Sequence, residues 1–232
     1  MKTLAILARK GGTGKTTLAV HLAVAAERAG LRTLLADMDP QRSAVEWRRE
    51  RREQGPAVAE VREGALFPAR QGAVRAGYDF MIMDTRSSGD LECAEAARLA
   101  DLCLLPVRPS FFDVRAIART VELVVNLRRP ALLVLNQAPS RRAGDEPRLI
   151  RDAIEELDRY GLPIAPVGLR YRAAFQNALK AGQAAQESAP DSPAAFEMNA
   201  LWAHVKRELW PDARAGWTLD DDLADREAVQ AA

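Results

Sequence analysis

The chain has 232 residues, 48% of them hydrophobic and 28% charged, and its formal net charge is +1. This composition is typical of a globular protein with a large core, and the near-neutral total charge gives no general sign of nucleic-acid binding. No stretch approaches the roughly 18 apolar residues of a membrane span, and the first residues lack the layout of a signal peptide. We therefore expect a soluble, cytoplasmic protein.

Short runs of β-branched and aliphatic residues alternate along the chain with longer segments of helical periodicity. This alternation is the pattern of β-α-β units, and it predicts an α/β fold with a doubly wound, mostly parallel sheet flanked by helices. The runs expected to form strands are residues 3–8, 32–37, 79–84, 102–107, 131–136 and 164–169, with a weaker one at 57–61.

Three helices are well delimited by the sequence. The first covers residues 15–30 and ends at Gly30, as a left-handed C-terminal cap favours. The second covers residues 110–129 and begins at the candidate N-cap Ser110. The third begins near Pro193, which suits a first helical turn, and its apolar stripe is expected to pack in the core.

The chain contains no internal repeat and no linker between these units, so we expect one domain over residues 1–210. Periodicity fades after Pro211. Residues 211–232 carry six acidic and two basic side chains, a net charge of −4, and are expected to form a loosely attached acidic tail.

The stretch LARKGGTGKTTLAV, Leu7 to Val20, follows the first expected strand and opens the first expected helix. Glycines in this position let backbone N–H groups approach a phosphate, and the helix N-terminus adds partial positive charge. Lys15 is expected to reach the β- and γ-phosphates, Thr16 to bind Mg²⁺ and Thr17 to contact the α-phosphate. The predicted nucleotide-binding residues of this loop are Gly11, Gly12, Thr13, Gly14, Lys15, Thr16 and Thr17.

This loop departs from the usual P-loop pattern, which requires a glycine five residues before Gly14. Arg9 occupies that position, and Lys10 follows it. The chain therefore carries a second lysine beside a loop that already has Lys15.

Aspartates follow two of the expected strands. Asp37 ends the run at residues 32–37, Asp39 follows it two residues later, and Asp84 ends the run at residues 79–84. Ligands of open α/β sheets bind at the carboxyl ends of the strands, so helix capping explains the three together less well than a Mg²⁺ and catalytic site does.

The motifs KGGTGKTT, LLADMDPQRSAVEW and YDFMIMDT, in this order, resemble those of the ParA/MinD family of deviant-Walker P-loop ATPases, and especially its small partition members. The resemblance covers roughly residues 1–210. It implies two subunits that sandwich two ATP molecules, with Lys10 as the signature lysine that reaches the partner's phosphates. Catalysis would then involve Lys10, Lys15 and Asp39, of which Asp39 positions the attacking water.

The same resemblance assigns the metal to Thr16 and Asp84, with Asp37 supporting the Mg²⁺ shell, and it makes Asn136 a contact of the adenine ring. One segment departs from the family: relatives often carry prolines after the Walker B aspartate, whereas this chain reads Thr85-Arg86-Ser87-Ser88-Gly89. Arg86 is equally compatible with sensing the γ-phosphate or a dimer partner and with lying at the surface.

The acidic tail argues against anchoring on an anionic membrane. Partition-type relatives bind DNA without sequence preference through basic residues and are released when a ParB-like or cargo-adaptor protein stimulates hydrolysis. The candidate DNA contacts are Arg141, Arg142, Arg170, Arg172 and Lys180. Nearby Tyr171 and Phe175 are expected to pack in the core.

The favoured function is therefore an ATP-dependent partition or cargo-positioning ATPase. Because the first expected strand begins at residue 3, we expect no N-terminal helix-turn-helix domain. The alternative is a metabolic or assembly ATPase on the same scaffold, such as an amidase or an iron-sulfur carrier. Cys93 and Cys103 do not match the paired cysteines of such carriers, and fit a reduced cytosolic protein.

Overall fold

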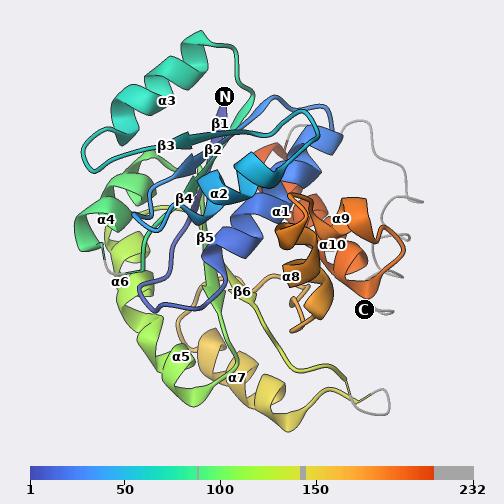
Figure 1. Ribbon diagram of the computed structural model, residues 1–232. Coiled ribbons are helices and arrows are strands. Elements are labelled where there is room, and N and C mark those ends of the chain that lie inside the picture. Colours follow the sequence, from blue (N-terminus) through green and yellow to red (C-terminus); the bar gives the residue numbers. More distant parts are fainter. Residues whose placement is uncertain (88, 142–144, 212–232) are drawn as a thin grey trace.

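A parallel sheet of six strands forms the centre of the protein in the computed structural model, which describes residues 1–87, 89–141 and 145–211 (Figure 1). The spatial order is β3-β2-β4-β1-β5-β6, and every pairing is parallel. The strands are β1 (Lys2–Ile6), β2 (Thr33–Asp37), β3 (Ala57–Glu60), β4 (Phe80–Asp84), β5 (Leu102–Val107) and β6 (Ala131–Leu135). The predicted α/β fold is confirmed, and the weak run at 57–61 forms β3.

Helices cover both faces of the sheet. One face carries α1 (Lys15–Arg28), α2 (Ser43–Glu50), α8 (Ala173–Lys180), α9 (Ala185–Ser188) and α10 (Pro193–Leu209). The other carries α3 (Leu66–Arg75), α4 (Asp90–Leu99), α5 (Phe111–Ala116), α6 (Ala118–Asn126) and α7 (Arg148–Asp158). This is the doubly wound arrangement that the alternating sequence pattern predicts.

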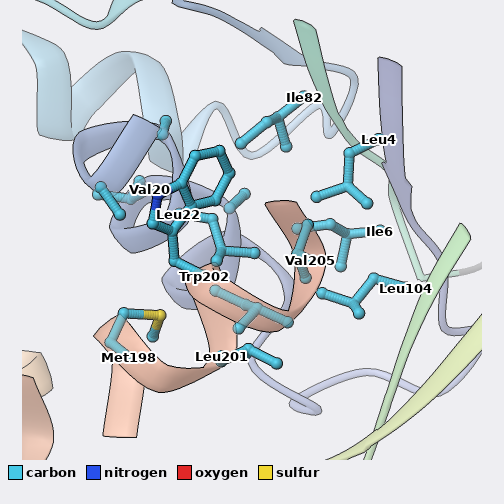
Figure 2. Packing of buried hydrophobic residues seen from close by; sticks show 14 of the residues in the cluster. Leu4, Ile6, Val20, Leu22, Ile82, Leu104, Met198, Leu201, Trp202 and Val205 are labelled. Atoms are coloured by element: carbon cyan, nitrogen blue, oxygen red, sulfur yellow. The ribbon is translucent and has the colours of Figure 1, made fainter. Parts of the chain in front are cut away.

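The strands are buried on both faces because successive side chains point to opposite sides. In β1, Leu4 and Ile6 pack toward α1 and α10, whereas Ala5 faces the other layer. Figure 2 shows Leu4 and Ile6 opposite Leu201 and Val205 of α10. Each face of the sheet thus has its own core, and β1 lies between them.

The predicted helix signals are found in the structure. Gly30 has a φ of 84°, the left-handed conformation expected after α1. The Ser110 side chain accepts a hydrogen bond from the Asp113 backbone N–H, so it caps α5. The single helix expected over 110–129 is divided into α5 and α6 at Ile117, whose backbone keeps near-helical angles.

The run at residues 164–169 does not form the expected strand. Pro163 and Pro166 lack the N–H groups that a regular ladder needs. The segment instead pairs with β6 at isolated points, where Ala165 and Leu169 donate backbone hydrogen bonds to the carbonyls of Leu133 and Leu135 at 2.8 and 2.9 Å. It therefore still runs alongside the outer edge of β6.

Part of the predicted tail lies outside the described residues, namely 212–232, as does the candidate DNA contact Arg142. The described chain up to Leu209 packs on the one sheet. None of the helices that the structure describes combines the length and the apolar content needed to cross a membrane.

Candidate nucleotide-binding site

The glycine-rich loop lies between the carboxyl end of the central strand β1 and the first turn of α1. Gly12 and Gly14 have φ angles of 74° and 84°, which L side chains rarely adopt. They let the chain turn tightly into α1, which begins at Lys15. The predicted strand–loop–helix arrangement is present at the point in the sheet where open α/β folds bind ligands.

Two amides from the end of β6 hold this loop in place. Asn136 Nδ2 donates to the Thr13 carbonyl at 2.7 Å, and Gln137 Nε2 donates to the Gly12 carbonyl at 3.0 Å. A Cβ atom at Gly14 would lie 2.5 Å from Asn136 Nδ2, so only glycine fits there. The structure therefore places Asn136, the predicted adenine contact, as a brace of the loop, and it adds Gln137, which sequence reasoning missed.

Lys15 is buried at the base of the loop and donates to the Ser87 hydroxyl at 2.7 Å. Burial lowers its pKa, while Asp84, Cys93 and Asp39 act in the opposite direction. Ser87 follows β4 and was not among the predicted site residues. The signal in the sequence that could have pointed to Ser87 was its place in the segment Thr85 to Gly89, which differs from the pattern of the family.

Asp84 ends β4 and is fully buried beside Lys15. Burial raises its pKa to about 7; the Thr16 hydroxyl and Lys15 lower it, while Asp37 adds to the rise. Neither carboxyl oxygen has a well-formed hydrogen bond within the described residues. Such an unpaired buried carboxyl, with a threonine hydroxyl close by, suits a bound cation.

This donor set fits Mg²⁺ in particular. The described residues contain no cluster of three or more His, Cys, Asp or Glu side chains able to hold a metal. Mg²⁺ is commonly bound by one or two protein oxygens, the remaining positions being filled by water and substrate phosphates. Thr16 and Asp84 could supply two such oxygens, because the Thr16 hydroxyl lies close to the Asp84 carboxyl.

The two aspartates at the carboxyl end of β2, Asp37 and Asp39, differ in their surroundings. Asp37 is buried, and it accepts backbone hydrogen bonds from Asp39 at 3.1 Å, Ala44 at 3.0 Å and Val45 at 3.1 Å. Asp37 therefore anchors the start of α2. Helix capping, which the sequence favoured less than a metal or catalytic role, accounts for the placement of Asp37. Burial raises the pKa of Asp37, and these hydrogen bonds oppose the rise. Asp39 is half-buried, and its carboxylate accepts a hydrogen bond from the Gln41 backbone N–H at 2.9 Å.

The two unusual residues at the start of the loop both form ion pairs. Arg9, in place of the expected glycine, lies 3.3 Å from Asp90 at the start of α4. Lys10 lies 3.0 Å from Asp113 in α5, a residue that sequence reasoning missed. The spacing Ser110-x-x-Asp113 resembles a capping box and was the available signal.

Arg86 is held by Glu92 of α4 at 3.1 Å. Both residues line a cavity of about 270 Å³ together with Asp37 and Asp39. Arg86 thus lies on the same side of the site as Asp37 and Asp39.

Most predicted DNA contacts are engaged within the protein. Arg170 is only 8% exposed and makes two 2.7 Å hydrogen bonds to Glu146, which corrects the expectation of a phosphate-facing side chain. Arg172 donates to buried Glu197 at 2.9 Å, and exposed Arg141 pairs with Glu146 at 3.4 Å.

Lys180 remains exposed at the end of α8, and it lines a cavity of about 430 Å³ with Thr16 and Thr17. Phe175 is buried as expected, but Tyr171 is 73% exposed, so the core packing predicted for it is wrong. Cys93 and Cys103 are both free and fully buried, so neither lies at a surface where a cluster could be shared.

Residues 4–185 match the family model described as the CobQ/CobB/MinD/ParA nucleotide binding domain. The chain belongs to this family. Its relatives include the maintenance of carboxysome distribution protein A of Halothiobacillus neapolitanus, 29% identical over 88% of this chain and 95% of the relative. Protein IncC of Escherichia coli is 27% identical over 78% of this chain and 62% of the relative. The predicted family is confirmed.

Solved structures of the family share the fold. The structure of apo McdA from Cyanothece has a TM-score of 0.74 and 19% sequence identity, and the match covers 90% of this chain and 99% of that one. The MinD protein of Pyrococcus horikoshii, complexed with Mg-ADP, has a TM-score of 0.68 and 18% identity over 89% and 96% of the two chains. The chain thus has the fold of this nucleotide-binding family, and one of its relatives is the chromosome-partitioning ATPase Soj of Thermus thermophilus, 26% identical over 55% of this chain and 63% of the relative.

Proposed function

We propose that this family member is an ATP-dependent positioning ATPase that dimerises on ATP, binds DNA without sequence preference and moves a plasmid, chromosome region or protein assembly. The observation that carries the proposal is the different placement of the two loop lysines. Lys15 is 6% exposed and donates to Ser87 close to Asp84, whereas the Lys10 side chain is 35% exposed and pairs with Asp113 of α5. One lysine can serve its own nucleotide while the other remains available to a second copy.

The loop can bind ATP with its own atoms. The backbone N–H groups of Gly11 to Lys15 and the start of α1 suit the phosphates, and Lys15 would leave Ser87 to meet the β- and γ-phosphates. Thr16 and Asp84 would hold Mg²⁺, which supplies charge neutralisation when bound. Thr17, in the first turn of α1, would contact the α-phosphate.

Hydrolysis requires an oriented water and a cation that stabilises the charge developing on the transferred phosphoryl group. Asp39 is half-buried with few internal partners, which suits it to orient the water. Lys10 of a second copy would supply the additional cation, as an arginine finger does. ATP binding would thereby promote association of the two copies, and hydrolysis would allow them to separate.

DNA association would be confined to the ATP-bound dimer and would place it on the nucleoid. Non-specific binding rests on Lys and Arg contacts with phosphates. Among the described candidates Lys180 and Arg141 are exposed, which favours them over Arg170 and Arg172. A ParB-like or cargo-adaptor protein would stimulate hydrolysis and couple the cycle to a cargo, in keeping with relatives named for carboxysome distribution and chromosome partitioning.

A gel-shift on random-sequence duplex DNA tests the proposal. At one fixed salt concentration, the protein should retard DNA with ATP and Mg²⁺ but not with ADP. Lys10→Ala should still bind a fluorescent ATP analogue yet fail to dimerise or shift DNA. Lys2→Ala is the matched control, because Lys2 begins β1 at the end opposite the loop. Equal binding with ATP and ADP, or none in either state, would refute DNA-dependent positioning.

A further inference from the structure

The Asp113 carboxylate forms ion pairs with two cationic side chains, Lys10 and Arg108, beside the phosphate loop. Its side chain is only 4% exposed. Oδ2 contacts Lys10 Nζ at 3.0 Å and the Ser110 hydroxyl, while Oδ1 accepts from Arg108 Nε at 3.1 Å and Nη2 at 3.0 Å. The Lys10 and Arg108 side chains are about one-third exposed.

This cluster lies directly beside the loop. Arg108 follows β5, the neighbour of β1 in the sheet. Its Nη1 atom lies 3.7 Å from where a Cβ of Gly12 would be. The ion pair between Lys10 and Asp113 therefore fixes the direction of the Lys10 side chain relative to the loop.

This arrangement lowers the free-energy cost of moving Lys10 away from Asp113. A buried carboxylate left without a partner is strongly unfavourable. Asp113 would not be left in that state, because Arg108 and Ser110 bind it through contacts that do not involve Lys10. One of the two cations can leave while the carboxylate keeps a charged partner.

We propose that Asp113 is a positioning residue that holds Lys10 on its own subunit until a nucleotide-loaded second copy takes the lysine, with Arg108 keeping the carboxylate paired afterwards. This rests on the proposed function, because Lys10 must have a destination in the partner. Asp113 then sets the threshold for dimerisation: the dimer forms only when the phosphates of the partner attract Lys10 more strongly than Asp113 does.

The first test measures the reactivity of Lys10 in the nucleotide-free protein. Lysines are labelled with an amine reagent for short times and quantified by peptide mass spectrometry, with Lys2 and Lys180 of the same sample as internal references. Asp113→Asn removes the charge but keeps the shape, and it should raise Lys10 labelling by about two- to fivefold. Arg108→Gln leaves Lys10 as the sole cation on Asp113 and should lower it. A purely structural role for Asp113 would not give opposite shifts.

The second test measures the ATP concentration at half-maximal dimerisation by sedimentation velocity. Asp113→Asn should lower this concentration severalfold relative to the wild type, and Asp113→Glu should restore much of the wild-type value. In a Lys10→Ala background, Asp113→Asn should have no effect on the residual association. Melting temperatures verify that each variant is folded.

The outcomes separate the two proposals. A wild type that dimerises on ATP and a Lys10→Ala variant that does not, combined with an Asp113→Asn variant indistinguishable from wild type in labelling and threshold, would overturn the role of Asp113 alone. An Asp113→Asn variant that loses dimerisation as Lys10→Ala does would also overturn it. A wild type that stays monomeric with ATP would overturn both.

Discussion

His21 lies in α1 one turn beyond the phosphate loop, fully buried against Phe175 with 5.0 Å between ring centroids. Its Nδ1 is 2.7 Å from the Thr17 carbonyl, which can only accept, so Nδ1 carries the proton of the neutral ring. Burial lowers the pKa of His21 to about 4, against weaker opposing effects of Thr17 and Glu187. The burial of His21 thus has a consequence for the stability of the fold.

Protonation of His21 should destabilise the fold. The unfolded chain titrates near the ordinary value of 6.5 and the folded chain near 4, so the unfolded state binds more protons between these values. The stability present above pH 6.5 is lost as the pH falls toward 4, by up to roughly 1.4 kcal/mol per pH unit. Urea denaturation across this range, compared between wild type and His21→Asn, measures the contribution.

The comparison must be made between variants because Asp84 acts in the opposite direction. Its pKa is raised by burial to about 7, so its contribution is fully present below the ordinary value of 3.8 and is lost as pH rises through 7. The His21→Asn variant keeps Asp84 and should therefore show a smaller loss of stability on acidification than the wild type. Parallel pH profiles for the two proteins would contradict the assignment to His21.

At the scale of elements, a buried ion pair joins α2 to the α8–α9 region. The Arg51 side chain, just after α2, is 3% exposed and donates to both carboxyl oxygens of Glu187 in α9 at 2.8 and 2.7 Å. It also donates to the Gly182 carbonyl at 3.0 Å and lies over the Trp47 ring. Because α2 follows the loop that carries Asp39, this contact holds one wall of the site.

Neutralising one member of this ion pair should destabilise the fold more than replacing both members by apolar residues. Glu187→Gln leaves the buried Arg51 charge with Glu53 alone, a 43% exposed carboxylate 3.7 Å away, and should lower the free energy of unfolding by about 3 kcal/mol. The double variant Arg51→Met/Glu187→Leu removes both charges and should recover a large part of that loss. Urea denaturation of the three proteins gives the values; a Glu187→Gln variant within about 0.5 kcal/mol of wild type would show that the pair contributes little.

At the scale of the whole molecule, the described subunit has the components of a nucleotide site but holds its second lysine in cis. Lys15 rests on Ser87 and Lys10 on Asp113. Phe111 and Phe112, which directly precede Asp113 in the sequence, are 63% and 74% exposed. The proposed cycle is therefore a change of partner for both lysines, from protein side chains to phosphates on one or the other subunit.

Removing Asp39, the acid proposed to position the attacking water, should arrest this cycle in the dimer. Asp39→Ala should bind ATP and Mg²⁺, remain dimeric for far longer than the wild type and hydrolyse ATP at a rate lowered by at least about a hundredfold. Light scattering coupled to size exclusion after ATP loading, with phosphate release measured in parallel, follows both properties. Asp158→Ala on exposed α7 is the control. An Asp39→Ala protein that stays monomeric with ATP would contradict the assigned role.

The family, the glycine-rich loop between a strand and a helix, and most of the strands could be predicted from the amino-acid pattern alone. Glycines, a lysine and threonines at fixed spacing act through local backbone geometry, and apolar runs of strand length report burial on both faces. For this reason the strand–loop–helix from β1 to α1 and the caps at Gly30 and Ser110 could be predicted. The run at 164–169 could not, because its composition fits a strand while its prolines prevent a regular ladder.

Which charged groups contact one another became clear from the packed fold and not from the sequence. Lys10 and Asp113, Lys15 and Ser87, and Arg170 and Glu146 are distant or unremarkable in sequence, and each pair depends on how helices pack beside the strand ends. A charged side chain near a motif looks the same in sequence whether it faces solvent or a buried partner. Burial and partner choice are properties of the packed chain, so Asp113 could be recognised, and Arg170 reassigned, only once the fold was known.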